Sequence, residues 1–285
     1  MSSPTGMLLS NNREKDNIRR EIEMKIKLLA LDVDGTLLND QHEITERTQR
    51  VIAQMQQQGV KIVLATGRGP KSTFPLAERL HLTDPIITHN GAVIVDPLTK
   101  EISLEIGFKS KELAEVIHYC REKHIHFDVN TALDMYAEDV PEHALPMYNK
   151  FFMQPEIVSD ATLLQHHIVK FTMFGNEKEI DRAFEEICLL FPELTIIRSG
   201  ELFIDIMHPK ATKGYALQQI LTMYEILPEE VISFGNYFND IEMLQLAGIG
   251  VAMQNSPAGV KELANYVTPS NNEDGVAEFL EKMIK

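Results

Sequence analysis

The 285-residue sequence has few cysteines and no long apolar segment. Its two cysteines, Cys120 and Cys188, lie far apart and form neither a disulfide framework nor a paired metal-ligand motif, so nothing requires an oxidising compartment. The apolar runs are broken by Asp or Gly and are far too short to span a bilayer. Residues 1–23 lack an apolar stretch of signal-peptide length. We therefore expect a cytoplasmic protein without a membrane-inserted segment.

Positive charge is also scarce, since 27 Lys and Arg residues face 42 Asp and Glu residues, a net charge of −15. A chain this acidic repels phosphate backbones and anionic lipids, which argues against nucleic acids and membranes as partners. A small anionic substrate is compatible if a metal, a lysine or helix N-termini make its site locally positive. The sequence leaves the oligomeric state open.

At both ends of the sequence, apolar strands alternate with amphipathic helices, a pattern typical of a parallel sheet covered by helices. The middle mixes strand pairs with helices and begins with a hairpin that turns at Asp96-Pro97. This order predicts an α/β core with an inserted α+β domain. The expected strands are 26–31, 62–65, 86–87, 93–95, 102–106, 125–129, 194–197, 202–206, 231–234 and 249–252, and the expected helices are 44–58, 70–80, 111–123, 177–190, 211–226 and 275–284.

The sharpest motif is a pair of carboxylates, Asp32 and Asp34, directly after the first apolar strand. Residues two apart in an extended stretch face the same side, so both can reach one site at the carboxyl end of the strand, where parallel sheets bind ligands. Gly35 supplies the sharp turn that follows. Paired carboxylates suit a Mg²⁺ site or a nucleophile with its acid/base partner. Two turn-forming aspartates are the structural alternative.

Three further polar clusters follow strands or open helices. Thr66 and Gly67 can hold phosphate oxygens through a hydroxyl and backbone N–H groups, or act as a helix cap and turn. Lys213 opens a helix and offers a compact positive charge, although most lysines are solvated surface residues. Asn236 and Asp240 share a helix face if the helix has already begun, and then supply oxygen ligands; a capped helix start is the alternative.

Together, the acid pair, threonine, lysine and Asn/Asp turn resemble the motifs of haloacid-dehalogenase-like (HAD) phosphatases, specifically the Cof-type subgroup. The resemblance covers residues 24–285 and implies a Rossmann-like parallel-sheet core with a large cap inserted between the second and third motifs. The predicted division is an N-terminal extension or tag at 1–23, a core at 24–90 and 208–285, and a cap at 91–207. The supporting runs lie at 89–92, 250–255 and 272–277.

The resemblance implies a role for each motif residue in a phosphatase that acts on small phosphorylated metabolites such as sugar, nucleotide or cofactor phosphates. Asp32 attacks phosphorus and becomes an aspartyl phosphate, while Asp34 protonates the leaving oxygen and then activates water. Positive charge must screen an aspartate that approaches an anionic phosphate. The roles implied for the other residues are phosphate and substrate binding for Thr66, Gly67, Lys213 and Asn239, and Mg²⁺ binding for Asp32, Asp34, Asn236 and Asp240.

The sequence departs from the family at Asn236, where similar proteins usually have an aspartate as direct metal ligand. An asparagine keeps a carbonyl oxygen but lacks the charge, so we predict weaker Mg²⁺ binding. Two alternative functions stay open at this point. One is a phosphotransferase or mutase with the same aspartyl phosphate, and the other is a weakly active or non-catalytic ligand-binding protein.

Other chemistry-bearing residues favour structural roles. Cys120, His124 and His126 suggest a metal cluster, but 125–129 is expected to be a strand whose alternate residues are exposed. Aromatic residues of the insert are more typical of core packing than of ring stacking on a substrate. These aromatic residues are Tyr136, Tyr148, Phe151 and Phe152.

Overall fold

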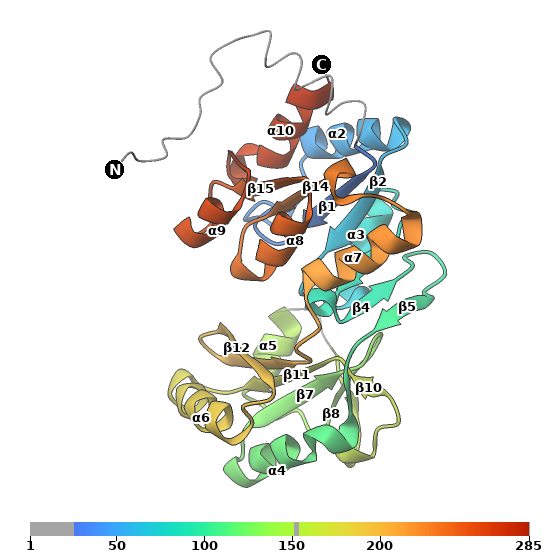
Figure 1. Ribbon diagram of the computed structural model, residues 1–285. Helices are drawn as coiled ribbons and strands as arrows, with labels where there is room; N and C mark the ends of the chain where they lie inside the picture. Colours follow the sequence, from blue (N-terminus) through green and yellow to red (C-terminus); the bar gives the residue numbers. More distant parts are fainter. Residues whose placement is uncertain (1–25, 151–153, 285) are drawn as a thin grey trace. The chain divides into compact units, whose positions relative to one another are not determined.

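A computed structural model of the chain describes residues 26–150 and 154–284 (Figure 1). The chain divides into two compact units: unit 1 comprises residues up to Ile62 and from Leu221 onward, and unit 2 comprises Val63–Ile220. The predicted extension at 1–23, and also Phe151 and Phe152, lie outside the described residues. The predicted domain boundaries stay predictions. No helix in the two described ranges is long and apolar enough to cross a membrane.

Unit 1 contains four parallel strands in the order β16-β15-β14-β1. Three of them are buried along their whole length, as expected for apolar strands covered on both faces. Leu31 pairs with Phe234, so the carboxyl ends of β1 and β14 reach the same edge of the sheet. The strands are β1 (Leu28–Asp32), β14 (Val231–Gly235), β15 (Ile249–Met253) and β16 (Tyr266–Thr268).

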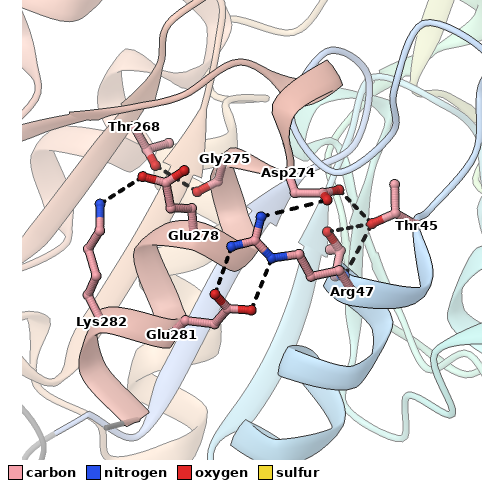
Figure 2. A network of polar contacts seen from close by, with 9 residues as sticks. Thr45, Arg47, Thr268, Asp274, Gly275, Glu278, Glu281 and Lys282 are labelled. Atoms are coloured by element: carbon pink, nitrogen blue, oxygen red, sulfur yellow. Dashed lines mark hydrogen bonds and ion pairs between the residues drawn. The ribbon is translucent and has the colours of Figure 1, made fainter.

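Two helices of unit 1, α2 and α10, lie side by side and are joined by polar contacts (Figure 2). Thr45 caps α2 by accepting a hydrogen bond from the Thr48 N–H (3.2 Å), and its hydroxyl donates to Asp274 Oδ1 (2.6 Å). Arg47 donates two bonds to Glu281 of α10 (3.0 and 2.7 Å). The unit contains α2 (Glu46–Gln57), α8 (Ile241–Leu246), α9 (Ala258–Leu263) and α10 (Gly275–Ile284), with 3₁₀ turns at Pro228–Glu230, Phe238–Asp240 and Asn271–Glu273.

Unit 2 continues from β2, which begins in unit 1, and pairs its strands in the order β2-β3-β4-β5. β2 and β3 are parallel, whereas β3 pairs antiparallel with β4 and β4 with β5, because a tight turn joins β3 to β4 and the predicted hairpin joins β4 to β5. This part contains β2 (Lys61–Ala65), α3 (Pro70–Arg79), β3 (Ile86–Thr88), a 3₁₀ turn (His89–Gly91), β4 (Val93–Val95), β5 (Ile102–Glu105) and the start of α7 (Lys213–Tyr224).

Unit 2 also contains a separate six-stranded sheet in the order β12-β13-β11-β7-β8-β9. One face packs on α4 and α6 through an apolar core that includes Phe127, Phe171 and Ile204. The elements are α4 (Ala114–Lys123), β7 (His126–Asn130), β8 (Met135–Ala137), α5 (Leu145–Lys150), β9 (Glu156–Ile157), β11 (Lys170–Phe174), α6 (Glu177–Leu190), β12 (Thr195–Gly200) and β13 (Phe203–Met207). Short elements beside them are β6 (Phe108–Lys109), β10 (His167–Ile168) and 3₁₀ turns at Ser110–Leu113 and Ala161–Leu163.

The architecture confirms the predicted α/β fold with an inserted α+β sheet, and two local expectations are wrong. The strand expected at 125–129 was predicted to expose alternate residues, but every residue of β7 is buried. Both faces are covered, one by the apolar core and the other by polar partners. The helix expected at 111–123 starts as a 3₁₀ turn and becomes α-helical only at Ala114.

Candidate active site

The predicted acid pair lies where β1 leaves the sheet of unit 1. Asp32 is the last residue of β1 and is 5% exposed, while Asp34 lies on the following loop and is exposed. The loop closes immediately, because the backbone N–H groups of Leu37 and Leu38 both donate to the Val33 carbonyl oxygen (3.1 and 2.9 Å). The two aspartates therefore differ in environment, one held in the sheet edge and the other open to solvent.

Gly35 brings the acid loop directly against Asn236 at the end of β14. Its φ of +77° is a left-handed conformation that favours glycine. A Cβ atom at this position would lie 2.4 Å from Asn236 Nδ2, so any other residue displaces that side chain. Gly35 therefore does more than form the predicted turn, because its lack of a Cβ atom leaves space for the Asn236 side chain.

The Asn236 amide completes a group of polar atoms with the acid pair. One of its terminal atoms lies 3.0 Å from Asp32 Oδ2, 2.9 Å from the Asp34 carbonyl oxygen and 3.2 Å from Thr36 Oγ1. Thr36 is buried, and its hydroxyl can donate or accept. Below, the term acid cluster denotes Asp32, Asp34, Thr36 and Asn236.

Asp240 holds the backbone of the acid cluster in place. Its Oδ2 accepts hydrogen bonds from the N–H groups of Asn236 (2.8 Å) and Tyr237 (3.0 Å), and the residue is fully buried. Asn236 precedes the 3₁₀ turn that begins at Phe238, so a shared helix face is not what relates it to Asp240. Asn239 lies exposed on the same turn, and its predicted role in substrate binding stays a prediction.

The acid cluster suits a small hard cation such as Mg²⁺. Oxygen ligands on neighbouring corners of an octahedral Mg²⁺ site, each about 2.1 Å from the metal, lie about 3 Å apart. The Asn236 terminal atom stands at 3.0 and 2.9 Å from the two oxygens of the acid pair. Within the described residues, no three His, Cys, Asp or Glu side chains form a metal-binding group, so this donor set depends on a main-chain carbonyl and an amide.

Thr66 and Gly67 lie at the end of β2 in unit 2 and contact the 3₁₀ turn after β3. Thr66 is 1% exposed and its Oγ1 accepts a hydrogen bond from the Arg68 N–H (3.1 Å). The Asn90 N–H donates to the Thr66 carbonyl oxygen (2.9 Å), and a Cβ atom on Gly67 would lie 2.9 Å from Asn90 Oδ1. The turn at residues 66–68 is thus held against Asn90 by a hydrogen bond and by close packing.

Lys213 is buried at the first position of α7, with 1% of its surface exposed. This burial excludes the alternative of a solvated surface lysine. The turn after β3 also packs on this helix start: a Cβ atom on Gly91, whose φ is +103°, would lie 2.1 Å from the Thr212 carbonyl oxygen and 2.8 Å from the Lys213 backbone nitrogen. The turn 89–91 therefore contacts both Gly67 and the start of α7, and brings these predicted phosphate-binding residues together in unit 2.

His89, in the same turn, was missed as a separate position by the sequence analysis. Burial, with a smaller contribution from the charge of Lys170, lowers its pKa to about 3. Within the part of the chain described, its Nδ1 atom has no hydrogen-bond partner. The imidazole is consequently neutral at physiological pH and contributes packing, not charge, beside Gly69, whose Cβ atom would lie 3.0 Å from His89 Cε1.

The six-stranded sheet carries a polar row that the sequence analysis also missed. Asp128, Thr172 and Asp205 are aligned across β7, β11 and β13, and all three are buried. Thr172 donates to Asp205 Oδ1 (2.9 Å), and Lys170 Nζ lies 3.9 Å from Asp205 Oδ2. The alternation of polar residues at 126, 128 and 130 is visible in the sequence, but it was interpreted as a solvent-exposed face.

Asp128 is the most perturbed carboxyl of this row. Burial raises its pKa to about 6, although the charge of Lys170 and a hydrogen bond from Tyr148 oppose the rise. The Tyr148 hydroxyl donates to Asp128 Oδ2 (3.1 Å) and lies 2.8 Å from His126 Nε2, while Asn130 Nδ2 donates to Asp128 Oδ1 (3.0 Å). These contacts hold the buried His126 and Tyr148 side chains in a hydrogen-bonded group with Asp128.

A parallel-sheet core with an aspartate pair at a strand end and a separate inserted sheet defines a class of α/β hydrolases. The model of the haloacid dehalogenase-like hydrolase family matches residues 29–280, and the chain belongs to this family. It falls in the Cof-type subgroup, subclass IIB, and is a phosphoric monoester hydrolase.

The comparisons extend over nearly the whole chain. The 5-amino-6-(5-phospho-D-ribitylamino)uracil phosphatase YcsE of Bacillus subtilis is 30% identical over 265 residues, or 93% of this chain and 98% of that protein. A haloacid dehalogenase-like hydrolase from Bacteroides thetaiotaomicron superposes with a TM-score of 0.82 at 30% identity, covering 91% of this chain and all of the other. A sugar phosphatase of HAD subclass IIB superposes with a TM-score of 0.75 at 28% identity, covering 90% of this chain and 98% of the other.

Proposed function

We propose that the protein is a Mg²⁺-dependent phosphatase that hydrolyses small phosphorylated metabolites through an aspartyl phosphate on Asp32. The observation that carries the proposal is the acid cluster, in which the Asn236 amide lies 3.0 Å from Asp32 Oδ2 and 2.9 Å from the Asp34 carbonyl oxygen. Such a cluster at a strand end suits a phosphatase, because an anionic nucleophile and an anionic substrate both need positive charge beside them.

Asp32 and Asp34 divide the chemistry according to their environments. Asp32 is held in the sheet edge, where its carboxylate attacks phosphorus while the bond between phosphorus and the ester oxygen breaks. The exposed Asp34 donates a proton to the departing oxygen and then accepts one from water. That water attacks the phosphorus of the aspartyl phosphate, the bond to Asp32 breaks, and inorganic phosphate leaves with the original nucleophile restored.

The residues gathered in unit 2 suit recognition of the phosphoryl oxygens. The Thr66 hydroxyl and the Gly67 N–H can donate hydrogen bonds to these oxygens, and the buried Lys213 side chain can offset their negative charge. The backbone contacts of Gly91 with 212–213 fix the point at which Lys213 leaves its helix. Each of these roles is a proposal that mutation can test.

The Asp32 carboxylate, the Asp34 carbonyl oxygen and Asn236 would hold Mg²⁺, with Asp240 supporting the turn and Asn239 beside it. The cation would supply charge neutralisation between the nucleophile and the phosphoryl group. Because Asn236 is neutral, this site carries one negative charge fewer than it would with an aspartate, and we propose that it binds Mg²⁺ weakly.

The substrate is proposed to carry hydroxyl groups beside its phosphate, as sugar and ribityl phosphates do. Two relatives act, by their names, on a sugar phosphate and on a phosphoribityl compound. Nucleotide and pyridoxal phosphates are the comparison substrates in the test.

The test measures release of inorganic phosphate from these compounds with Mg²⁺ at high millimolar concentration. We expect turnover of one or more polyol phosphates and a loss of roughly a thousandfold or more in Asp32→Asn, because the nucleophile is removed. Asp96→Asn is the matched control, since Oδ1 of this turn residue accepts bonds from the N–H groups of Leu98 and Thr99 and an asparagine can keep them. Equal turnover in Asp32→Asn, or phosphoryl transfer to a second sugar in preference to water, would contradict the proposal.

A further inference from the structure

We propose that Asn236 is a swivel that closes the cation site when no metal is present. In the metal-free protein its amide nitrogen donates to the two oxygens of the acid pair, and Mg²⁺ binding turns the amide by 180° so that its oxygen faces the cation. This inference rests on the proposed function, because it takes the acid cluster as the Mg²⁺ site.

Without a cation, the hydrogen-bonding pattern around the side chain favours one orientation, with nitrogen at the inner terminal position. With oxygen at the inner terminal position, that oxygen faces Asp32 Oδ2 and the Asp34 carbonyl oxygen, neither of which donates, and the outer nitrogen faces only donors. With nitrogen at that position, the amide donates to Asp32 Oδ2 (3.0 Å) and to the Asp34 carbonyl oxygen (2.9 Å). The first arrangement groups three oxygens that repel one another without a cation, and the second satisfies them without one.

The surroundings permit the turn without moving the backbone. The two ends of an amide have nearly the same size, so exchanging them conserves packing. Asp240 Oδ2 holds the Asn236 N–H at 2.8 Å, and Gly35 leaves room for the outer end of the side chain. Thr36 bonds the inner terminal atom in either orientation, because its hydroxyl donates to oxygen and accepts from nitrogen.

An aspartate at position 236 cannot perform this function. It has no N–H to donate, so without metal its carboxylate faces the Asp32 carboxylate and the Asp34 carbonyl oxygen. With metal the added charge strengthens binding. Compared with an aspartate, the asparagine binds the cation less tightly but keeps the metal-free site ordered. The site should therefore be occupied only when the concentration of free Mg²⁺ is high.

The first experiment compares thermal unfolding of the full-length wild type and Asn236→Asp, each with chelator and with excess Mg²⁺. We expect the midpoint of Asn236→Asp to fall by roughly 3 °C or more with chelator and to recover with Mg²⁺. Calorimetric titration should show Mg²⁺ binding on the order of tenfold tighter in the variant. Asn39→Asp is the charge-matched control, because its side-chain oxygen accepts from two backbone N–H groups, a role that an aspartate keeps.

The second experiment observes the amide itself and does not depend on how the variant folds. The side-chain ¹⁵N–¹H₂ signals of Asn236 are identified as the pair missing from the Asn236→Asp spectrum, or by selective labelling. In the metal-free wild type these protons should exchange slowly with water, because carboxylate and carbonyl oxygens hold them. Adding Mg²⁺ should accelerate their exchange and shift both signals.

Amide protons that stay equally protected with and without Mg²⁺ would overturn the swivel, as would a metal-free Asn236→Asp as stable as the Asn39→Asp control. These readouts are separate from phosphate release. A Mg²⁺-dependent amide turn in a protein that hydrolyses no phosphomonoester would support the swivel and contradict the proposed function. Phosphate release by a protein whose Asn236 amide does not turn would support the proposed function and contradict the swivel.

Discussion

At the scale of single residues, burial in this protein changes the chemistry of groups that look ordinary in the sequence. Lys213 and Asp128 are both buried, yet one lies at the start of a helix and the other in a sheet with polar neighbours. His89 remains neutral because burial lowers its pKa to about 3. Residue type alone therefore does not tell which of these groups is charged.

Asp128 gives a prediction of pH dependence. Its pKa is about 6 in the folded protein against 3.8 for an unperturbed aspartate, so the folded state binds the proton more tightly. This contribution to stability is present below about pH 4 and is lost as the pH rises through 6. We therefore expect Asp128→Asn to be more stable than the wild type at pH 8 by about 1–3 kcal/mol, and the advantage to shrink at pH 5.

Urea unfolding of the two proteins at both pH values measures this difference. An asparagine can keep the local bonds, because the Tyr148 hydroxyl can accept from it and donate to His126. The control is Asp134→Asn, which removes an exposed ion pair with Lys71 and should change stability by about 0.5 kcal/mol or less at either pH. An Asp128→Asn protein less stable than the wild type at pH 8 would contradict the assignment.

At the scale of elements, short caps and turns position the longer helices and strands. The turn His89–Gly91 contacts Gly67 and also the start of α7, which lies far along the sequence. In unit 1, the residues before α2 and α10 contact each other in the same way (Figure 2).

The N-cap of α2 gives the prediction at this scale. Thr45 makes the capping bond to Thr48 and also joins the start of α10 through Asp274. We expect Thr45→Ala to lower the free energy of unfolding by about 1–2 kcal/mol, because both bonds are lost and the partners are left without this hydroxyl. Thr45→Ser keeps the hydroxyl and should retain most of the stability. Chemical denaturation of the three proteins checks both values.

At the scale of the whole molecule, net charge dominates the response to salt. The chain carries −15, whereas exposed ion pairs contribute little each. Monovalent salt shortens the range of the repulsion, with a Debye length of about 10 Å at 0.1 M. We expect the midpoint of thermal unfolding in chelator to rise as KCl increases from low concentration. A falling midpoint would mean that the ion pairs, such as Arg47 with Glu281, outweigh the repulsion.

Much of the fold was predictable because the spacing of apolar residues along the chain reflects which faces of each helix or strand are buried. The helices expected at 177–190 and 275–284 coincide with α6 and α10, and the buried strands that were expected agree within one or two residues, but the buried strand β11 was missed. Short elements such as α5, α9, β6, β9, β10 and β16 were missed, because a few residues carry too little periodic pattern. The acid pair was found because both residues lie on one continuous strand end.

The family, the alternation of strands and helices, and the residues proposed for phosphoryl transfer could all be recognised in the linear sequence. Their surroundings became known only from the fold. These are the contacts of the Asn236 amide with Asp32 and Asp34, the burial of Lys213, and the polar row formed by Asp128, Thr172 and Asp205. The physical reason is that charge, pKa and hydrogen bonding depend on neighbours distant in sequence, which a linear pattern does not specify.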